Sequence, residues 1–431
     1  MATQDSPKPS VLIVGAGCFG LATAYTLASS GYDKITVLEK DDVMPSRFSA
    51  GNDLNKIIRA EYADNFYTDL SISAIRKWQS DPLYKPHFHQ TGFLNVTSEN
   101  APQATKNVVT NYLTSIRGHQ AFKGQVEEVH GAEDIQRIAP AFTGPTAGWS
   151  GYFNKLAGYA HSADASRAVY DACVGLGVNF VLGRDNGEVS ELVYDTISSR
   201  RACVGVKTRG NNNIYHADKV ILALGADVPG LIPQLGSQVT GRCWGVVHIQ
   251  LTPEEASPLR GIPVTNVRDL AFFFEPDEAT NKLKFCHMGG GFTNFDRSPN
   301  GLSLPYEKLE DSQFVPLDDQ TYIRTLLREV FPQFADHPLI DKHLCWFADT
   351  VDSDYIIDYV PDTNSSLIVL SGDSGHGFKM LPIFGHFVKE ILEQGSQKEA
   401  KWQWKDDTKL KATGTWRGDT ATQELSEIER A

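Results

Sequence analysis

The N-terminal part of the chain contains two short apolar runs separated by a helical pattern. Val11–Val14 is apolar and leads into glycines, residues 19–29 follow a helical spacing, and Ile35–Leu38 is apolar again. Short apolar runs bounded by turn residues are typical of buried strands, and longer periodic stretches are typical of helices. The pattern predicts a strand–helix–strand unit followed by a polar loop over residues 41–55.

Further strands and helices alternate along the rest of the chain, without an internal repeat. This mixture favours an α/β fold. The polar tail after Gly395 contains Trp402, Trp404 and Trp416, and we expect these indoles to dock on the body. Strands are predicted over residues 92–96, 178–182, 219–224, 246–251, 272–275, 283–286 and 367–370, and helices over residues 162–176, 322–330 and 383–392.

Length and charge narrow the class of protein. The chain has 431 residues, which exceeds one ordinary core, so two intertwined domains are expected. Its net charge of −13 argues against a nucleic-acid partner, because phosphate binding needs a basic surface. No apolar run is long enough to cross a bilayer, so no membrane association is expected. We therefore expect a monomer that acts on a small molecule.

The spacing of the cysteines and the residues at the two ends of the chain favour an intracellular location. Six cysteines are scattered without a C-x-x-C pair, which is typical of a reduced intracellular protein and predicts no metal site. The first ten residues lack the basic and apolar regions of a signal peptide. The final Glu-Arg-Ala differs from the Ser-Lys-Leu peroxisomal signal, so the cytoplasm is expected rather than the peroxisome.

Glycines in the spacing G-x-G-x-x-G follow the first predicted strand. Gly15 permits a tight turn, Gly17 lets the backbone approach a pyrophosphate, and Gly20 lets the next helix pack on the strand. Glu39, at the end of the second predicted strand, can accept hydrogen bonds from ribose hydroxyls. The complete pattern predicts a dinucleotide site, but it does not separate NAD from FAD.

Several separated blocks resemble one family of FAD-dependent amine oxidases. Lys219–Asp227 is similar to the strand-and-glycine segment that many FAD oxidoreductases place beside the nucleotide. Ser49–Lys56 and Phe272–Asp277 resemble fungal fructosyl amino acid oxidases, also called amadoriases, whereas Lys56–Tyr62 looks more like monomeric sarcosine oxidase and pipecolate oxidase. Cys345–Leu381 resembles the C-terminal signature of the same superfamily.

The resemblance covers residues 11–390 and implies FAD as the cofactor. In this family a cysteine at the position of Cys345 carries FAD through a thioether to the flavin 8α-methyl group. A thiolate can attack that carbon, and a nearby cation favours the thiolate. The turn from Gly372 to Gly377 lies against the pyrimidine end of the flavin in the family, where N–H groups stabilise negative charge. Within this turn, His376 is interpreted as structural or flavin-lining.

The same resemblance implies substrate-binding residues. Arg59 and Lys379 correspond to the pair that grips the substrate carboxylate in sarcosine oxidase, although amadoriases lack an arginine at position 59. Lys56 matches an amadoriase lysine that promotes reaction with O₂, since a cation stabilises superoxide. Glu275 matches an amadoriase glutamate that contacts sugar hydroxyls, and Phe347 replaces a tyrosine of sarcosine oxidase.

The resemblance also implies how the domains divide. A Rossmann-type FAD-binding domain is expected over residues 1–88, 153–235 and 346–431. A discontinuous second domain, built on a mixed, largely antiparallel sheet plus helices, is expected over residues 89–152 and 236–345. This second domain would bind the substrate.

The predicted site residues fall into three groups. The catalytic residues are Lys56, Arg59 and Lys379, and the substrate-binding residues are Arg59, Glu275, Phe347 and Lys379. Structural alternatives stay open, namely a buried cysteine at 345, a solvated lysine at 56 and a hairpin glutamate at 275. The cofactor-binding residues are Gly15, Gly17, Cys18, Phe19, Gly20, Glu39, Lys40, Ser49, Gly51, Asn55, Lys56, Gly225, Cys345, Asp373, Gly375, His376, Gly377, Phe378 and Lys379.

These residues imply a flavin-dependent oxidase of a secondary amine in an N-substituted or cyclic amino acid, of the N-methyl amino acid, pipecolate or saccharopine type. A hydride would pass to FAD, an imine would form, and O₂ would be reduced to H₂O₂. One alternative is a fructosyl amino acid oxidase, supported by Ser49–Lys56 and Glu275. A second alternative is an amine oxidase that tailors secondary metabolites, and a non-enzymatic nucleotide-binding protein is disfavoured by the number of matching blocks.

Overall fold

The computed structural model describes residues 7–298, 300–405 and 421–430. These residues form two compact units, each assembled from separated stretches of the chain. The first unit contains the described residues of 1–53, 162–241 and 347–413, and the second contains those of 54–161, 242–346 and 414–431. The predicted α/β fold with sheets of mixed orientation is confirmed.

The first unit is built on a mostly parallel sheet around β1 (Val11–Val14). Val11 pairs with Ile35 on one side and with Lys219 on the other. All four residues of β1 are buried, as expected for a parallel sheet covered on both faces. In order across the sheet, the strands are β20 (Ile356–Tyr359), β21 (Leu367–Ser371), β13 (Lys219–Leu222), β1, β2 (Ile35–Glu39) and β9 (Asn179–Leu182).

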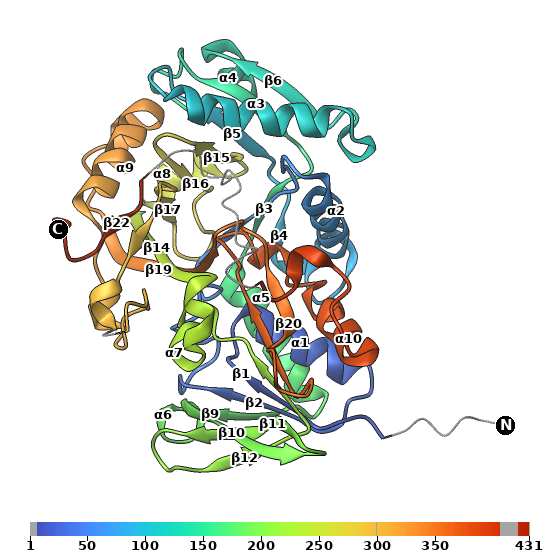
Figure 1. Cartoon of the computed structure of the whole chain (residues 1–431). Coiled ribbons are helices and arrows are strands. Elements are labelled where there is room, and N and C mark those ends of the chain that lie inside the picture. The colour runs from blue at the N-terminus through green and yellow to red at the C-terminus, as the bar shows by residue number, and fades with distance from the viewer. Residues whose placement is uncertain (1–6, 299, 406–420, 431) are drawn as a thin grey trace. The chain divides into compact units, whose positions relative to one another are not determined.

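Helix α1 (Cys18–Ser29) begins at the predicted glycine turn. A Cβ atom on Gly20 would lie 1.9 Å from the carbonyl oxygen of Gly15, and one on Gly15 would lie 2.4 Å from the carbonyl oxygen of Ala223. The turn therefore brings α1, β1 and the end of β13 to distances that exclude a side chain. α1 contacts α5 (Ser162–Gly175) and α10 (Phe384–Gln394), which lie beside it (Figure 1).

The second unit is built on a large mixed sheet. Val264–Val267 pairs in parallel with Phe93–Thr97 and antiparallel with Ala271–Phe273, and Phe93–Thr97 pairs antiparallel with Ser150–Asn154. Among the described residues, the order is β22 (Gln423–Glu424), β18 (Phe292–Thr293), β14 (Val239–Gln250), β17 (Lys282–Cys286), β16 (Ala271–Phe273), β15 (Val264–Val267), β5 (Phe93–Thr97), β7 (Ser150–Asn154) and β6 (Val126–His130), with β19 (Ile340–Thr350) paired to β14.

Two small antiparallel sheets complete the strands. One joins β10 (Val189–Ile197), β11 (Arg200–Thr208) and β12 (Ile214–His216) in the first unit. The sequence analysis missed this sheet. β10 and β12 are exposed or half-buried and mix polar with apolar residues, so no apolar run marks them, whereas the middle strand β11 is largely buried. The other sheet joins β3 (Lys56–Ile58), β8 (Gly158–Ala160) and β4 (Phe88–His89) in the second unit.

The remaining helices cover the sheets of their own units. A cluster of buried apolar residues in the second unit includes Phe273 and Phe285 of the sheet and Phe331 beyond α9. The helices are α2 (Asn65–Ser80), α3 (Gln103–Arg117), α4 (Ala132–Ile138), α6 (Arg184–Gly187), α7 (Val228–Leu231), α8 (Pro253–Ala256) and α9 (Leu317–Val330). Short 3₁₀ turns lie at Lys85–His87, Gln120–Phe122, Gly225–Asp227, Pro233–Ser237, Ser257–Leu259, Phe295–Arg297, Glu310–Ser312, Pro332–Phe334, Phe378–Met380 and Ala400–Trp402.

The unit boundaries differ from the predicted domain boundaries at several places. Residues 54–88 and 153–161 pack with the second unit, although the sequence placed them with the nucleotide-binding part. Residues 236–241 pack with the first unit. The described end of the chain also packs with the second unit, where β22 pairs with β18 and Leu425 is buried beside Phe292. Which unit binds FAD and which binds the substrate stays a prediction.

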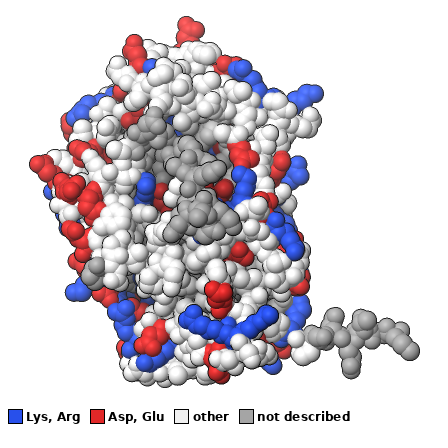
Figure 2. Space-filling model, viewed as in Figure 1, with Lys and Arg blue, Asp and Glu red and all other residues white. Residues whose placement is uncertain are grey.

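The C-terminal arm docks in part as expected. Trp402 is buried, with its ring 4.7 Å from that of Phe387, and Trp404 packs against the core of the first unit. Trp416 lies outside the described residues. In the described part of the chain, no helix is both long and apolar enough to cross a bilayer. Acidic and basic side chains are interspersed over the face seen in Figure 2.

Replacing Gly20 by alanine should destabilise the first unit, because the new methyl group would collide with the backbone of Gly15. We expect the free energy of unfolding to fall by about 3 kcal/mol or more. Urea denaturation followed by circular dichroism measures this change. Gly175→Ala is the matched control, since a Cβ atom there meets open space. Equal stability of the two variants would contradict the proposed packing.

A buried carboxyl group in α9 should make stability depend on pH. Asp319 is 2% exposed and accepts a hydrogen bond of 3.1 Å from the backbone N–H of Gly245, and burial raises its pKa to about 8. The folded protein then holds this proton more tightly than the unfolded chain, in which an aspartate has a pKa of about 4. The contribution of Asp319 to stability should therefore fall as the pH rises from about 4 to about 8.

Asp319→Asn cannot ionise and should remove this fall. The free energy of unfolding of the variant, relative to the wild type, should increase between pH 5 and pH 8. Asp33→Asn, at an exposed position of the first unit, is the control that should leave the pH profile unchanged. Parallel pH profiles for Asp319→Asn and the wild type would refute the assignment.

Candidate active site

The glutamate at the end of β2 is fixed beside the glycine turn. Glu39 is 6% exposed, and its Oε2 atom accepts a hydrogen bond of 2.9 Å from the backbone N–H of Ala16. Its Oε1 atom accepts from the backbone N–H of Asp41 at 3.0 Å and from Ser46 Oγ at 2.9 Å. These bonds hold the carboxylate rigidly while lone pairs remain for further donors, such as the hydroxyls of a ribose.

The neighbouring lysine is held by an ion pair. Lys40 Nζ lies 2.6 Å from Asp227 Oδ2 and 4.4 Å from the centre of the Phe48 ring. Gly225, two residues before this aspartate, has a φ of +55°, and a Cβ atom there would meet open space. Contact of Lys40 and Gly225 with a cofactor stays a prediction.

A cradle of small residues faces the start of α1 within the first unit. A Cβ atom on Gly17 would lie 3.2 Å from Ser49 Oγ, and one on Gly51 would lie 3.6 Å from Phe378 Cδ2. Ser166 Oγ is buried and finds no hydrogen-bond partner among the described residues. A Cβ atom on Gly51 would lie 3.5 Å from this unpaired atom, and a buried polar atom in such a place is expected where a polar ligand completes the site.

The start of α1 is open to an anion. Gly17 is its N-cap residue, no described side chain caps it, and no acidic residue lies in its first turn. The N–H groups of the first helical turn lack partners within the helix, and the helix dipole places partial positive charge there. Cys18 Sγ lies 3.9 Å from the carbonyl oxygen of Phe378, and burial raises the pKa of Cys18. These features fit a pyrophosphate at this end of α1.

The turn between β21 and α10 is tied down by its own side chains. Asp373 Oδ2 accepts a hydrogen bond of 2.9 Å from the N–H of Ala348, and its Oδ1 accepts one of 3.0 Å from the N–H of Gly375. His376 Nδ1 lies 3.1 Å from Tyr355 Oη, and its Nε2 lies 2.9 Å from the carbonyl oxygen of Ser353. Both ring nitrogens of His376 are therefore engaged, which supports a structural role.

Four other predicted residues of the first unit are packed tightly. A Cβ atom on Gly377 would lie 2.9 Å from Phe19, whose ring stacks on Phe384 with centroids 3.6 Å apart. Lys379 is 4% exposed, and its Nζ donates a hydrogen bond of 2.8 Å to the carbonyl oxygen of His376. Phe347 is 3% exposed. Lys379 is thus a buried cation held by the glycine-rich turn.

Within the second unit, the structure brings Lys56 and Cys345 together. Lys56 Nζ lies 3.3 Å from Cys345 Sγ, although 289 positions separate them in the sequence. Cys345 is partly exposed, whereas Cys173, Cys203, Cys243 and Cys286 are buried. Burial raises the pKa of Cys173 to about 12. An ammonium group beside a sulfur stabilises the negative charge of a nucleophilic thiolate, so Cys345 has the surroundings of a reactive cysteine.

A second lysine of this unit was not singled out in the sequence. Lys284 is 1% exposed, and its Nζ donates a hydrogen bond of 2.8 Å to the carbonyl oxygen of Asn55, the residue before Lys56. The alternation Leu283-Lys284-Phe285 resembles a strand with one face in solvent, but β17 is buried on both faces. A fully buried lysine is rare and is a candidate functional residue.

Arg59 is enclosed by aromatic rings. It is 7% exposed, its Cζ atom lies 4.9 Å from the ring centre of Tyr62 and 5.3 Å from that of Tyr112, and its Nη1 donates to the carbonyl oxygen of Glu61. Burial alone would lower the pKa of Arg59, but the oxygens of Tyr112, Tyr62 and Glu61 together raise it. Arg59 belongs to the second unit and Lys379 to the first.

Glu275 is engaged by residues outside its own hairpin. Its Oε1 accepts a hydrogen bond of 2.8 Å from Tyr159 Oη, and its Oε2 accepts one of 2.5 Å from the N–H of Gly261. The Tyr159 ring stacks on His89 with centroids 4.8 Å apart. This network uses part of the acceptor capacity of Glu275, which favours the structural alternative.

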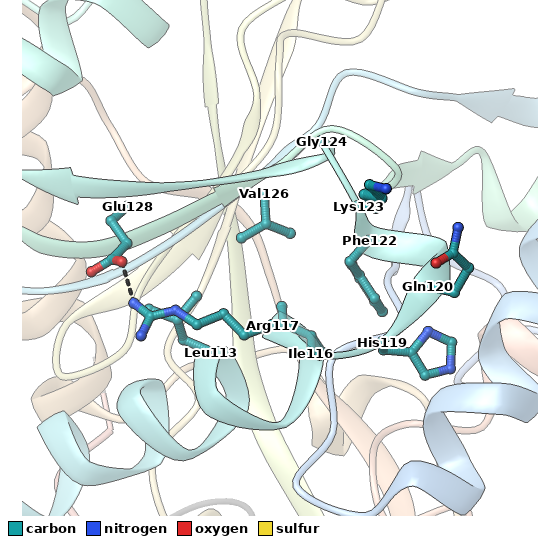
Figure 3. A pocket seen from close by; sticks show the side chains of 11 residues that line it. Leu113, Ile116, Arg117, His119, Gln120, Phe122, Lys123, Gly124, Val126 and Glu128 are labelled. Atoms are coloured by element: carbon teal, nitrogen blue, oxygen red, sulfur yellow. Dashed lines mark hydrogen bonds and ion pairs between the residues drawn. The ribbon is translucent and has the colours of Figure 1, made fainter.

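A separate pocket lies on the second unit. It has a volume of ≈ 360 Å³ and is lined by the end of α3, the turn at Gln120–Phe122 and β6 (Figure 3). Arg117 and Glu128 form an ion pair at its edge, and none of the predicted site residues lines it. Within the described ranges, no group of three His, Cys, Asp or Glu side chains is placed to hold a metal ion.

The βαβ turn, the fixed glutamate and the cradle around α1 define a dinucleotide-binding protein, and Lys56 beside the partly exposed Cys345, together with the buried Lys284, suggests an oxidoreductase. Comparison with known sequences identifies the family. Residues 10–391 match the family described as FAD dependent oxidoreductase (DAO). The chain belongs to this family, and the predictions of an oxidoreductase and of FAD as cofactor are confirmed.

Individual relatives match over nearly the whole chain. L-saccharopine oxidase of Schizosaccharomyces pombe is 31% identical over 416 residues, which cover 93% of this chain and 94% of the relative. Monomeric sarcosine oxidase of a Bacillus species is 25% identical over 89% of this chain and 91% of its own. The crystal structure of the deglycating enzyme fructosamine oxidase (Amadoriase II) from Aspergillus fumigatus superposes with a TM-score of 0.88 at 31% identity, covering 99% of this chain and 98% of that one.

These relatives confirm the predicted kinship with saccharopine oxidase, sarcosine oxidase and amadoriases. The roles of the individual site residues stay predictions.

Proposed function

We propose that the protein oxidises the C–N bond of a secondary amine in an N-substituted or cyclic amino acid. The observation that carries the proposal is the buried guanidinium of Arg59, at a position where the resemblance to sarcosine and pipecolate oxidases predicts the carboxylate-binding arginine. The full-length similarity to an L-saccharopine oxidase supports the same class of substrate.

The residues of the chain would bind the substrate and the cofactor, while bound FAD supplies the two-electron acceptor for the C–N bond and passes the electrons to O₂. Arg59 and Lys379 would each bind a substrate carboxylate. The resulting imine would be hydrolysed by water. Lys56, and with it the buried Lys284, would place positive charge where O₂ is reduced.

Glu39 and the N-terminus of α1 would hold the ribose and the pyrophosphate of FAD, and the cradle of Gly17, Ser49 and Gly51 would surround it. Cys345 would tether FAD through a thioether to the 8α-methyl group. Formation of this C–S bond releases two electrons and two protons, which O₂ takes up as H₂O₂. The adjacent ammonium of Lys56 supports this role, since it favours the sulfur nucleophile.

A fructosyl amino acid oxidase is the second candidate function, favoured by the fold similarity to Amadoriase II at a TM-score of 0.88. The hydrogen bonds that Tyr159 and Gly261 make to Glu275 argue against it, because they occupy the carboxylate proposed to bind sugar hydroxyls. An amine oxidase that tailors secondary metabolites differs only in the fate of the imine, which product mass would reveal. A monomer in the cytoplasm completes the proposal.

A peroxide-release assay tests the substrate class. We expect H₂O₂ from saccharopine, pipecolate or sarcosine, and less from fructosyl-lysine or fructosyl-valine. Arg59→Gln and Lys379→Gln should each raise KM for the carboxylated amine by about 10- to 100-fold, because each removes a charged hydrogen bond. Arg167→Gln, on the exposed face of α5, is the control that should leave KM unchanged. A faster reaction with the fructosyl compounds would favour the amadoriase instead.

Acid precipitation tests the tether. The wild-type pellet should stay yellow after washing, and Cys345→Ser should release its flavin into the supernatant. Cys203→Ala, in β11, is the matched control that should keep the colour. Free flavin from the wild type would exclude the thioether without affecting the proposed amine oxidation.

A further inference from the structure

A second arginine shares the aromatic ring that encloses Arg59. Arg268 directly follows β15, and its backbone N–H donates a hydrogen bond of 2.9 Å to the carbonyl oxygen of Val96. Its Cζ atom lies 5.6 Å from the ring centre of Tyr112, while that of Arg59 lies 5.3 Å from the same ring. Arg268 is partly exposed, in contrast to Arg59.

Tyr112, whose ring lies near both guanidinium groups, carries a hydroxyl group that has no partner in the described part of the chain. Tyr112 is 2% exposed, and its Oη atom is buried and finds no hydrogen-bond partner among the described residues. A buried hydroxyl left without a partner costs free energy, so such an atom points to a group that is bound during function. An O–H donor flanked by two guanidinium groups suits a carboxylate, which only accepts hydrogen bonds.

The electrostatics of the cluster agree with this assignment. Burial lowers the pKa of Arg268, and the positive charge of Arg59 lowers it further. Of the neighbouring groups, Tyr112 has the largest opposing effect on the pKa of both arginines, which places its oxygen close to both charges. Two like charges held together within a protein are stabilised when an anion binds between them.

We propose that Arg268 and Tyr112, next to the carboxylate-binding Arg59, form a second carboxylate subsite that selects substrates with an additional acidic arm. The subsite lies wholly within the second unit. The proposal rests on the proposed amine oxidation and narrows it, because one carboxylate near the reacting C–N bond is common to all N-substituted amino acids. The preferred substrate is then an amino acid whose nitrogen substituent or side chain ends in a second carboxylate.

Binding of unreactive acids to the FAD-loaded protein tests the subsite without turnover. Isothermal titration calorimetry should show tighter binding of glutarate than of pentanoate, which has the same chain length and one carboxylate. Arg268→Gln and Tyr112→Phe should each weaken glutarate binding by about 10- to 100-fold and about 3- to 10-fold respectively, with little change for pentanoate. Equal binding of the two acids by the wild type would overturn the proposal.

The matched control is Tyr152→Phe, which removes a hydroxyl group that already accepts a hydrogen bond of 2.9 Å from Asn95 Nδ2 in the same cluster. It should lower the melting temperature without changing the ratio of glutarate to pentanoate affinity. If all three variants lose both acids equally, the residues support the fold and select nothing, which also overturns the proposal.

Turnover gives an independent readout. In Arg268→Gln, kcat/KM should fall by about 10- to 100-fold for saccharopine and change little for pipecolate, which has one carboxylate. An equal fall for both substrates would contradict a selective role. Absence of peroxide from every amine tested on the wild type would refute the proposed function, while the preference for glutarate would still report on the subsite.

Discussion

The arrangement of the first unit depends on the tight backbone packing between the turn after β1 and the start of α1. The carbonyl oxygen of Gly15 occupies the space that a side chain on residue 20 would need, and that of Ala223 occupies the space beside Gly15. Because neither position tolerates a Cβ atom, α1 begins directly at the edge of the parallel sheet. The partial positive charge at its N-terminus then lies beside Glu39, which the same turn holds through Ala16. The cradle of Ser49, Gly51 and Phe378 is arranged around this point.

The second unit depends on a different balance, the cost of burying cations. Arg59 and Lys284 are almost completely buried, and charged groups are tolerated inside proteins only when they are paired or hydrogen-bonded. Arg59 packs against tyrosine rings and donates a hydrogen bond to a backbone carbonyl group. Lys284 donates one to the carbonyl oxygen of Asn55. Such sites are expensive for stability alone, so their presence indicates chemistry. An enzyme that binds carboxylates and reduces O₂ needs positive charge in a place with little water.

The contact between Lys56 and Cys345 links β3 to β19 within this unit. Neither residue is unusual by itself, since a lysine in a loop and an isolated cysteine are common. Their distance of 3.3 Å makes the pair a candidate for the proposed tether, in which the sulfur would fix the cofactor near the lysine. Arg268 and Tyr112 show the same principle. Neither residue stands out in the sequence, and they are candidates for substrate binding because the fold brings both close to Arg59.

The sequence by itself determined the elements whose pattern is local. The apolar runs at Val11–Val14 and Ile35–Glu39, the glycine spacing and Glu39 define the βαβ unit, because turn geometry and strand burial follow from neighbouring residues. Family membership and FAD also followed from short motifs. Only the tertiary structure decided which unit residues 54–88 join, that β17 is buried on both faces around Lys284, and that Tyr112 lies between two arginines. These features depend on contacts between segments that are distant in the sequence. A local pattern of polar and apolar residues does not predict which side chains will be in contact across a sheet.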